Sequence, residues 1–522
     1  MPKQKQNQIS DLFIIGGGIN GCGIARDASG RGLSVTLVEM DDLASATSSS
    51  STKLFHGGLR YLEYLEIRLV REALKEREIL LRNMPHISWP MRFVLPYHKD
   101  MRYEGDSPVS RMLSIFMPWA KGQRPAWLIR LGLFFYDNLG GRKILSGTSS
   151  INLETNPVGS PINNRFKKAY EYSDCWINDA RLVVLNARDA QKRGANILTR
   201  CKAIFAKRVE GLWEIETLDQ ITGETQHFKA RILVNASGPW VKDVIENTTK
   251  IESNDGIRLV RGSHIVTKKL FDHDKSYIFQ GEDGRIIFAI PYEKNFTLIG
   301  TTDVDHPDAD SKPECTEEEI AYLCTFASKY FKQPITPDHV VWTYSGVRPL
   351  YNDGSDSATA ATRDYVLKVD QSSGEAPLLN IFGGKITTYR RLAESALEKI
   401  TPFFKDIGEA WTENEPLPGG DFPIDGVGKL TEELIEEYPY LTLQWAQRLI
   451  QSYGTEAQKI LRDSSSVKDL GINFGGTLTE REVEWLIQNE FAHTTEDIIW
   501  RRSKLGLHMS EVEIAKLDKW IS

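Results

Sequence analysis

Apolar positions change their spacing along this chain, and each spacing predicts a different kind of element. Short apolar runs at 12–15 and 34–38 are typical of strands buried on both faces of a parallel sheet. Similar runs at 232–234 and 378–382 predict two more buried strands, and each ends in small residues. Residues 62–83 repeat leucine and alanine at helical intervals between charges, which predicts a solvated amphipathic helix.

The middle of the chain has a strand-rich pattern. Residues 168–219 predict a strand, a helix over 179–193, a further strand and a hairpin. Between 257 and 342, short alternating runs turn at glycine-containing breaks. This spacing predicts an antiparallel sheet that covers the N-terminal domain.

Beyond about residue 403 the pattern changes again. A link rich in glycine, proline and acidic residues looks like a domain boundary. Helical repeats follow, with capping-box starts at Thr479 with Glu482 and at Ser510 with Glu513. The pattern predicts a compact helical domain without evident chemistry of its own.

The turn after the first predicted strand suits a dinucleotide. In its G-x-G-x-x-G motif the first glycine permits a tight turn, the second lets backbone approach a pyrophosphate, and the third lets the helix pack on the strand. The helix that follows points its N-terminal N–H groups at the phosphates. An acidic residue ends the second strand, where it accepts hydrogen bonds from an adenosine ribose and disfavours NADP. The predicted contacts are Gly16, Gly18, Ile19, Asn20, Gly21 and Glu39.

Three later segments favour FAD over NAD. The serine-rich run 44–60 offers hydroxyls, N–H groups and a cation, and it continues into an apolar and aromatic motif, as linkers rarely do. The small residues 235–238 end a strand that can pass beneath a dinucleotide. A glycine turn at 383–385 precedes a helix whose start would stabilise negative charge on a reduced flavin. The predicted contacts are Thr47, Ser48, Ser49, Lys53, His56, Gly57, Gly58, Gly238, Gly384, Lys385, Thr387 and Thr388.

These elements predict an α/β protein with three domains. A length of 522 residues is compatible with about two to four domains. We expect a Rossmann FAD domain, an antiparallel β-sheet substrate-binding or cap domain, and a C-terminal α-helical domain. Their predicted ranges are, in that order, 1–90, 165–245 and 340–402; 91–164 and 246–339; and 403–522.

Composition and charge narrow the partners. A net charge of −7 argues against nucleic-acid binding, which favours a basic surface. The five cysteines are odd in number and lack C-x-x-C spacing, so we expect neither a disulfide framework nor a metal site. The polar N-terminus lacks a signal-peptide core, and no run of about 18 apolar residues predicts a membrane span. These patterns favour a cytoplasmic location.

One segment stands apart from this acidic chain. Residues 91–143 hold nine Lys and Arg against four Asp and Glu, a local charge of +5, interleaved with apolar and aromatic residues. An interfacial membrane segment has this composition, with aromatic residues at headgroup depth and cations facing anionic lipid. A core helix with basic ends explains the same pattern equally well. Peripheral binding to the inner face of the cell membrane is therefore one of two open interpretations.

Four residues are candidates for substrate chemistry. His264 lies mid-strand among apolar neighbours, where a lone histidine is more often a satisfied core residue. Arg348 and Arg363 stand beside strand ends or turns, and Arg60 follows the glycines of the serine-rich run. Each arginine alone is more often half of a salt bridge, but the three together suit an oxyanion substrate.

The motifs, taken in order, resemble a known family. GGGINGCGIARDASGRGLSVTLVE, KLFHGGLRYLE, GSHIV, TYSGVRPL, TRDY and FGGKITTYRRLAE occur in one chain. The set resembles the FAD-dependent, quinone-linked glycerol-3-phosphate dehydrogenases of respiratory chains, within the glutathione-reductase and D-amino-acid-oxidase type of flavoprotein. The resemblance covers nearly the whole chain, and its specific motifs are KLFHGGLRYLE, TYSGVRPL and FGGKITTYR.

The resemblance implies oxidation of sn-glycerol 3-phosphate to dihydroxyacetone phosphate, with electrons passing through noncovalent FAD to a membrane quinone. His264 is the hypothetical base that takes the hydroxyl proton, and Arg348 and Lys385 would stabilise the developing alkoxide. The family's pattern puts in the substrate pocket Arg60, Tyr61, His264, Arg348, Arg363 and Lys385.

Several points stay open at this stage. Residues 101–123 appear as a longer insertion than the family pattern needs, which puts the transfer of its membrane-contact surface in doubt. The residues near the flavin do not separate a quinone-linked enzyme from an oxidase that uses oxygen. An amine or amino-acid oxidase and a non-catalytic flavin-binding protein are weaker alternatives. A homodimer is compatible with the resemblance, but no pattern specifies the oligomeric state.

Overall fold

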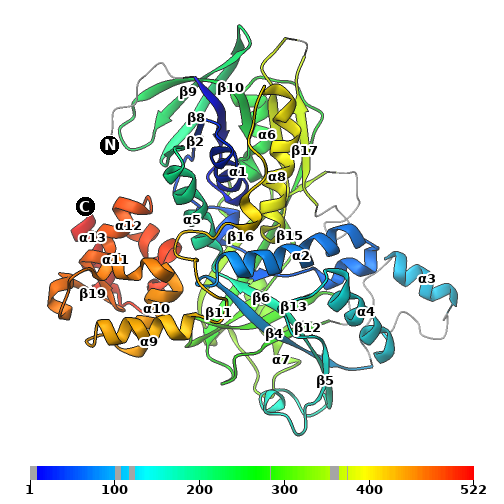
Figure 1. Cartoon of the computed structure of the whole chain (residues 1–522). Coiled ribbons are helices and arrows are strands. Elements are labelled where there is room, and N and C mark those ends of the chain that lie inside the picture. Colours follow the sequence, from blue (N-terminus) through cyan, green and yellow to red (C-terminus); the bar gives the residue numbers. More distant parts are fainter. Residues whose placement is uncertain are drawn as a thin grey trace.

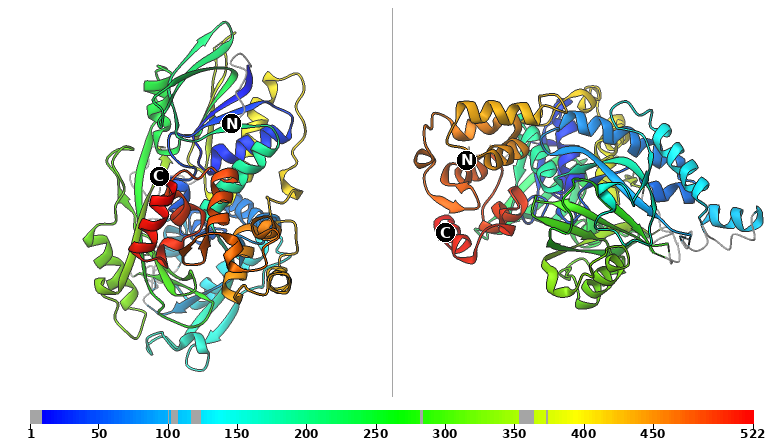
Figure 2. Two further views of the ribbon diagram at one scale, coloured as in Figure 1. Left: turned by 90° about the vertical axis from the view of Figure 1, so that its left-hand side faces the viewer. Right: turned by 90° about the horizontal axis from the view of Figure 1, so that it is seen from below.

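The computed structural model describes residues 9–99, 101, 107–116, 124–281, 284–352, 364–372 and 374–522. Within these ranges the chain forms two large β-sheets, helices packed around them, and a C-terminal part built mainly of helices (Figure 1). The C-terminal part also holds a two-stranded sheet of β19 (Asn473–Gly475) and β20 (Leu478–Thr479). The C-terminal part, orange to red in Figure 2, lies at one end of the molecule, and the cyan helix α3 (Pro108–Phe116) lies at the other.

The first sheet contains the predicted parallel strands. Within the described ranges its central strands run in the order β18-β10-β1-β2-β7 and are all parallel, while β17, β9 and β8 are antiparallel additions. The four apolar runs lie in β1, β2, β10 and β18, so these strand predictions are confirmed. The strands are β1 (Ser10–Ile15), β2 (Val35–Val38), β7 (Asn196–Leu198), β8 (Cys201–Val209), β9 (Leu212–Asp219), β10 (Thr225–Asn235), β17 (Val366–Asp370) and β18 (Leu378–Phe382).

The second sheet is largely antiparallel, as the pattern between 257 and 342 predicts, although β12 runs parallel to β4. Pairing places β3, β6 and β16 here, whereas the predicted domain ranges assign them to the FAD domain. The reason is that β6 pairs with β4, and β16 with β11, along most of their length. The strands are β3 (Leu54–Phe55), β4 (Ser88–Tyr97), β5 (Ser149–Asn152), β6 (Lys168–Ile177), β11 (Ile257–Lys268), β12 (Ser276–Gln280), β13 (Ile286–Tyr292), β14 (Phe296–Gly300), β15 (Val304–Asp305) and β16 (Val340–Tyr351).

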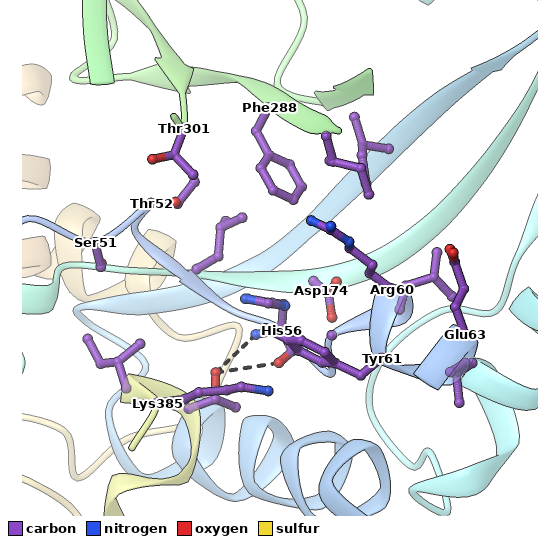
Figure 3. A pocket seen from close by; sticks show the side chains of 18 of the residues that line it. Ser51, Thr52, His56, Arg60, Tyr61, Glu63, Asp174, Phe288, Thr301 and Lys385 are labelled. Carbon is purple, nitrogen blue, oxygen red and sulfur yellow. Dashed lines mark hydrogen bonds between the residues drawn. The ribbon is translucent and has the colours of Figure 1, made fainter. Parts of the chain in front are cut away.

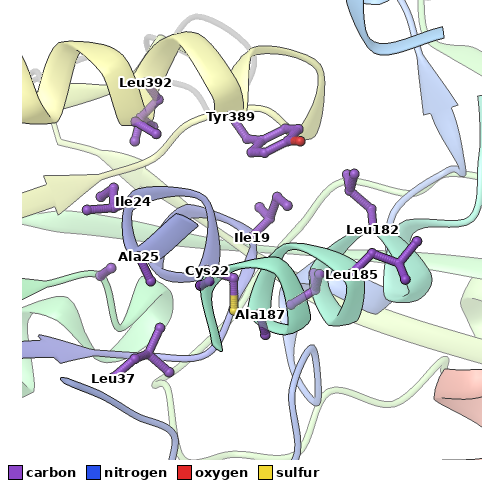
Figure 4. Close-up of a cluster of buried hydrophobic side chains, with 14 of the residues drawn as sticks. Ile19, Cys22, Ile24, Ala25, Leu37, Leu182, Leu185, Ala187, Tyr389 and Leu392 are labelled. Atoms are coloured by element: carbon purple, nitrogen blue, oxygen red, sulfur yellow. The ribbon is translucent and has the colours of Figure 1, made fainter. Parts of the chain in front are cut away.

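The core beside the first sheet forms around α1. Its apolar side chains pack against α5, α8 and the strands, with Cys22 and Ala25 fully buried and Tyr389 almost so (Figure 4). The predicted helix at 179–193 is present as α5. The helices are α1 (Ile19–Gly30), α2 (Ile67–Asn83), α3, α4 (Ala126–Leu139), α5 (Asp179–Lys192), α6 (Val241–Asp243), α7 (Glu317–Ser328), α8 (Tyr389–Ile400), α9 (Val427–Glu437), α10 (Leu443–Tyr453), α11 (Ala457–Leu461), α12 (Glu480–Asn489) and α13 (Glu511–Ile521).

Helix α2 differs from its prediction in start and in charge. A 3₁₀ helix occupies Leu59–Tyr64, and Leu65 has a left-handed φ of 59°, so the α-helix begins only after it. Two of its charged residues are buried rather than solvated. Glu76 accepts from Arg390 Nη2 at 2.6 Å, and Arg77 Nη1 donates to Asp174 at 2.5 Å. These pairs tie α2 to helix α8 and to strand β6, because a buried charge needs a partner of opposite sign.

The C-terminal part contains the expected helices, and one of the two predicted capping boxes. Ser510 and Glu513 form a capping box at α13. Thr479 makes no side-chain cap at α12, because the Glu482 carboxylate is instead occupied by Arg448, at 2.7 Å, and by the Tyr453 hydroxyl. A buried ion pair therefore replaces the local cap.

Candidate active site

The glycine turn between β1 and α1 has the close backbone approach that its sequence predicts. Gly16 has a φ of +113°, and a Cβ there would overlap the carbonyl oxygen of Ala236. A Cβ on Gly21 would overlap the carbonyl oxygen of Gly16. The small residues after β10 thus lie directly against the turn, with Ala236 N donating to Ile15 O at 2.9 Å.

Glu39, the residue predicted to bind ribose, contacts the backbone of this turn. The two carboxylate oxygens of Glu39 accept from Gly17 N at 2.6 Å and from Asp41 N at 2.9 Å. Burial of the carboxyl group raises the pKa of Glu39 to about 7, against the opposing effect of these two N–H donors. The carboxyl is therefore fixed at the edge of the sheet beside the helix start.

The serine-rich run reaches the same helix start. Ser48 Oγ accepts from Ile19 N at 3.0 Å in the first turn of α1, and the Thr47 hydroxyl donates to Val347 O at 2.6 Å. A helix N-terminus with hydroxyls beside it is a favourable place for phosphate oxygens. The run is thus part of the fold and not a linker.

A cavity of about 780 Å³ begins at this helix and extends between the two sheets. Most side chains predicted for cofactor and substrate meet there, some of them drawn in Figure 3. The predicted residues that line it are Ile19, Thr47, Ser48, His56, Gly58, Arg60, Tyr61, His264, Arg348, Gly384, Lys385 and Thr387. Gly16, Gly18, Gly21, Asn20 and Glu39 lie in or beside the glycine turn, outside this lining. The remaining predicted residues outside it are Ser49, Lys53, Gly57, Gly238 and Thr388.

Lys53 is the predicted cofactor contact whose surroundings differ most from that role. Its side chain is buried, and Nζ donates to Asp179 at 2.7 Å and to the carbonyl of Ser49. The ammonium also lies 4.7 Å from the centre of the Tyr344 ring. It turns away from the cavity because the buried Asp179 carboxylate needs a cation. Arg363, a predicted substrate residue, lies outside the described residues.

His264, on β11, is buried yet lines the cavity. Its ring stacks on Tyr344 with centroids 4.6 Å apart, and Nε2 lies 3.0 Å from Thr52 Oγ. Burial, and then the charges of Arg348 and Lys53, hold the pKa of His264 well below its ordinary value. The imidazole is therefore neutral at physiological pH, as a proton acceptor requires.

Two cations stand near this histidine. Arg348 Nη1 donates to Asp303 at 2.6 Å, and Nη2 donates to Thr301 Oγ at 3.0 Å. Lys385 Nζ lies 3.5 Å from the centre of the Tyr61 ring, a cation–π contact. With Arg60 on the same lining, the cavity presents positive charge beside a neutral base.

Sequence reasoning missed the residues that position these groups. Thr52 contacts His264, and Asp303 with Thr301 orients Arg348. Thr52 lies in the serine-rich run, which is predicted to contact the cofactor, whereas Thr301 and Asp303 follow β14 in the segment IGTTD, for which the sequence predicts no role. Only pairing of β11 with β14 and β16 brings IGTTD to Arg348, so spacing alone had no signal for it.

A family model described as "FAD dependent oxidoreductase" matches residues 11–390. The chain belongs to the FAD-dependent oxidoreductase family. A second model, described as "C-terminal domain of alpha-glycerophosphate oxidase", matches residues 410–519. The helical C-terminal part of this flavoprotein is thus itself matched by a family model. The predicted FAD cofactor and the predicted fold class are confirmed.

Relatives and a solved structure confirm the resemblance seen in the sequence. The flavoprotein is 47% identical to D-erythritol 1-phosphate dehydrogenase of Brucella abortus over 98% of this chain and 97% of the relative. It is 45% identical to aerobic glycerol-3-phosphate dehydrogenase of Escherichia coli over 98% and 97%. The glycerol-3-phosphate dehydrogenase of Bacillus halodurans, solved with FAD, superposes with a TM-score of 0.73 at 26% identity, covering 99% of this chain and 89% of that one.

The residues present fit FAD. The glycine turn leaves no room for a Cβ on Gly16 or Gly21, so it requires glycine at both positions, as a dinucleotide-binding turn does. Glu39 at the end of β2 offers carboxylate oxygens to a ribose. At the far end Gly384, with a φ of +99°, and Lys385 begin the turn before α8. Groups that suit the adenosine and pyrophosphate end of FAD and groups that suit its flavin end are therefore both present.

Proposed function

We propose that this flavoprotein oxidises sn-glycerol 3-phosphate to dihydroxyacetone phosphate and passes the electrons to a membrane quinone. The observation that carries the proposal is the neutral, buried His264 on a cavity lined by Arg60, Arg348 and Lys385. A base next to several cations suits an alcohol that carries a phosphate dianion. An amino-acid substrate would need an ammonium-tolerant, apolar site instead, so the cations disfavour that alternative.

His264 takes the proton from the substrate hydroxyl in this proposal. Nε2 is the receiving atom, because its contact, Thr52, is also a cavity residue. Tyr344 holds the ring plane by stacking, and the lowered pKa keeps the imidazole neutral before substrate arrives. Nε2 accepts the proton in the tautomer that carries its hydrogen on Nδ1. The base is thus ready without a prior deprotonation step.

Two cations are available to the reacting oxygen, and one of them also suits the phosphate. Arg348, oriented by Asp303 and Thr301, presents a fixed guanidinium fork that suits a phosphate or an alkoxide. Lys385 holds a point charge over the Tyr61 ring beside the glycine turn. Both stabilise negative charge that develops as the hydroxyl proton leaves.

The glycine turn, Ser48, Glu39 and the Gly384–Lys385 turn would hold FAD. When bound, FAD supplies the two-electron acceptor that the oxidation needs. Of the remaining predicted cofactor contacts, His56 lies on the cavity wall, and Ser49, Gly57, Gly238 and Thr388 stay predictions outside its lining.

An anaerobic titration tests the substrate. Flavin absorbance of the holoenzyme should bleach on addition of sn-glycerol 3-phosphate and stay unchanged with glycerol, which lacks the phosphate. A His264→Asn variant should bind flavin but bleach far more slowly. A holoenzyme that stays oxidised with the phosphate ester refutes the proposal.

A four-carbon polyol phosphate is the second candidate substrate. The relative from Brucella abortus carries the name D-erythritol 1-phosphate dehydrogenase, and its identity to this chain is as high as that of the glycerol-3-phosphate dehydrogenases. Both substrates share a phosphate and a secondary alcohol, so the same cations and base serve each. A ratio of kcat/KM for the two compounds decides between them.

The proposed quinone acceptor binds in an apolar region of the same cavity. The apolar lining comes from the leucines of η2 (Leu59–Tyr64) and from apolar side chains of α3 and α4, with Leu128 and Phe135 among them. Phe135 is also 50% exposed, so the apolar lining is continuous with the molecular surface. A quinone ring and its isoprenoid tail are apolar ligands of this kind.

Docking on a membrane surface completes the proposal. On α4, Trp127 and Phe134 are 57% and 55% exposed and Arg130 is exposed between them. Ile115 of α3 is 75% exposed. No helix in the described part of the chain has the length and apolar character to span a bilayer. We infer that this apolar, basic face binds anionic lipid as a peripheral surface on the cytoplasmic side.

Vesicle flotation tests the docking. Trp127→Ser with Phe134→Ser should release the protein from vesicles of phosphatidylglycerol and phosphatidylethanolamine. The matched control replaces Leu443 and Val512, which are 64% and 80% exposed on the C-terminal part, and should stay bound. Equal binding of both double variants contradicts the proposed surface. Phe116 and Trp119, aromatic residues of the same segment, have side chains outside the described residues.

The acceptor is tested separately from docking. Turnover in detergent with a short-chain quinone should exceed hydrogen peroxide formation by a wide margin. Stoichiometric peroxide would instead support an oxygen-using oxidase. Sedimentation of the detergent-solubilised holoenzyme tests the homodimer, which the described residues do not specify.

A further inference from the structure

The loop that follows Glu39 is held by the C-terminal part of the chain. Asp42 in this loop is buried, and its carboxylate accepts from Arg502 Nη1 at 2.5 Å and Nη2 at 2.7 Å. Arg501 Nε also donates to Asp42, at 2.5 Å. Both arginines belong to the π-helix Asp497–Arg502, more than four hundred residues away in sequence.

The two arginines are themselves anchored. Arg502 is fully buried, and its Nε and Nη2 donate to Glu490 O at 3.0 and 2.7 Å. Arg501 Nη2 donates to Asp497 at 2.5 Å. Because the Arg502 guanidinium makes four hydrogen bonds, two to Glu490 O and two to the carboxylate, its fork fixes the orientation of the Asp42 carboxylate.

A second contact holds the same loop from its other side. Arg200 donates from Nη1 to Asp41 at 2.6 Å and from Nη2 to Asp497 at 2.8 Å. The amide of Asp41 is one of the two groups that hold the Glu39 carboxylate. The loop between β2 and the serine-rich run is therefore clamped where it positions Glu39.

We propose that the C-terminal part completes the adenosine end of the FAD site, with Asp42 and Arg502 as positioning residues that act through Glu39. The inference rests on the proposed role of Glu39 as the ribose ligand. The model of the FAD-dependent family matches only residues 11–390, and a separate model matches 410–519, so the clamp joins two separately recognised parts. The helical part, which has no cavity chemistry of its own, thereby gains a function in cofactor retention.

The physical reason is the cost of a buried charge. Without Arg502, the Asp42 carboxylate would be buried without its bidentate partner, which is unfavourable enough to move the loop toward water. Movement of the loop would carry the Asp41 amide away from Glu39. The carboxylate would then lose the orientation in which it can meet a ribose diol.

The test measures FAD dissociation constants of the apoprotein by flavin fluorescence. Asp42→Asn should weaken FAD binding by about 5- to 50-fold, the range expected for coupled neighbouring groups. Glu456→Gln is the matched control, since this carboxylate accepts from Arg188 Nη1 at 2.8 Å across the same interface without contacting Asp42, Arg501 or Arg502. It should lower the melting temperature to a similar extent and leave the FAD constant within about twofold.

A double-mutant cycle separates positioning from general destabilisation. Glu39→Gln alone should weaken FAD binding, and Asp42→Asn should add little in that background, because both changes remove the same ribose contact. Arg502→Lys, which keeps the charge but not the fork, should weaken binding less than Arg502→Gln. If Glu39→Gln leaves the constant unchanged, the ribose role itself is wrong. If Glu39→Gln weakens binding but Asp42→Asn does not, or if the two effects add fully, the positioning role is wrong.

Discussion

Truncation of Arg348 is the sharpest perturbation of the proposed substrate site. Arg348→Ala removes the guanidinium that donates to Asp303 and Thr301 on the cavity wall. The backbone position is secured by pairing of β16 with β11, so the strand itself should persist. The variant therefore removes a charge from the site with little change in the sheet.

The size of the effect follows from the exposure of the pair. Removing one partner of a buried hydrogen-bonded charge contact costs about 2–5 kcal/mol. The side chains of Arg348 and Asp303 are 27% and 28% exposed, so solvent screens part of the interaction and the lower end applies. A loss of about 2–3 kcal/mol corresponds to roughly a 30- to 150-fold fall in kcat/KM.

Steady-state kinetics of the holoenzyme measure this loss. Asp303→Asn in the Arg348→Ala background should recover part of it, because the carboxylate that Arg348 offsets no longer repels a phosphate. Arg258→Ala is the control, since Arg258 forms a comparable pair with Asp305 on the same sheet, is 28% exposed, and lies outside the cavity. A kcat/KM within about threefold of wild type for Arg348→Ala, or an equal loss in Arg258→Ala, would refute the reasoning.

The burial of His264, Glu39 and Glu482 leads to the remaining predictions. Because the pKa of His264 lies well below 6.5, kcat/KM should show its acid limb only well below pH 6.5, and a limb centred at 6.5 would argue against His264 as the base. The pKa of His264 is lower in the folded protein than in the unfolded chain, so protonation favours the unfolded chain. The free energy of unfolding should therefore decrease as pH falls below 6.5. FAD affinity should fall as pH drops through about 7, where Glu39 gains a proton, and Glu39→Gln should remove that slope in a fluorescence titration. With the carboxyl pKa raised, the FAD-free protein should lose stability as pH rises from 4.5 toward about 7. Finally, Glu482→Ala leaves Arg448 and the Tyr453 hydroxyl without their shared partner and should cost about 3–5 kcal/mol in thermal unfolding, whereas a loss under about 1 kcal/mol would make the pair dispensable.

Local patterns succeeded where local physics decides the outcome. The strand at 378–382 has the predicted bounds, and the Gly16 turn has the predicted close approach. Both depend on backbone geometry and on apolar residues that are neighbours in sequence. Helix α2 began later than its leucine spacing suggested, because the left-handed Leu65 interrupts the helix.

Charged side chains were harder to place from sequence. Lys53 reads as a cation beside phosphates but pairs with Asp179 inside the protein. Glu482 reads as half of a capping box but binds Arg448. In each case the partner lies more than thirty residues away, and a buried ion pair outweighs the local alternative.

The amino-acid sequence alone determined the FAD-binding unit and the set of cations and histidine available for a phosphate ester. These follow from short-range spacing, because a glycine turn, a helix start and an acid at a strand end need only neighbouring residues. Tertiary structure alone decided that His264 is neutral, that Asp303 orients Arg348, and that the C-terminal arginines hold the loop after Glu39. Burial and long-range pairing set those properties, and neither is a function of spacing along the chain.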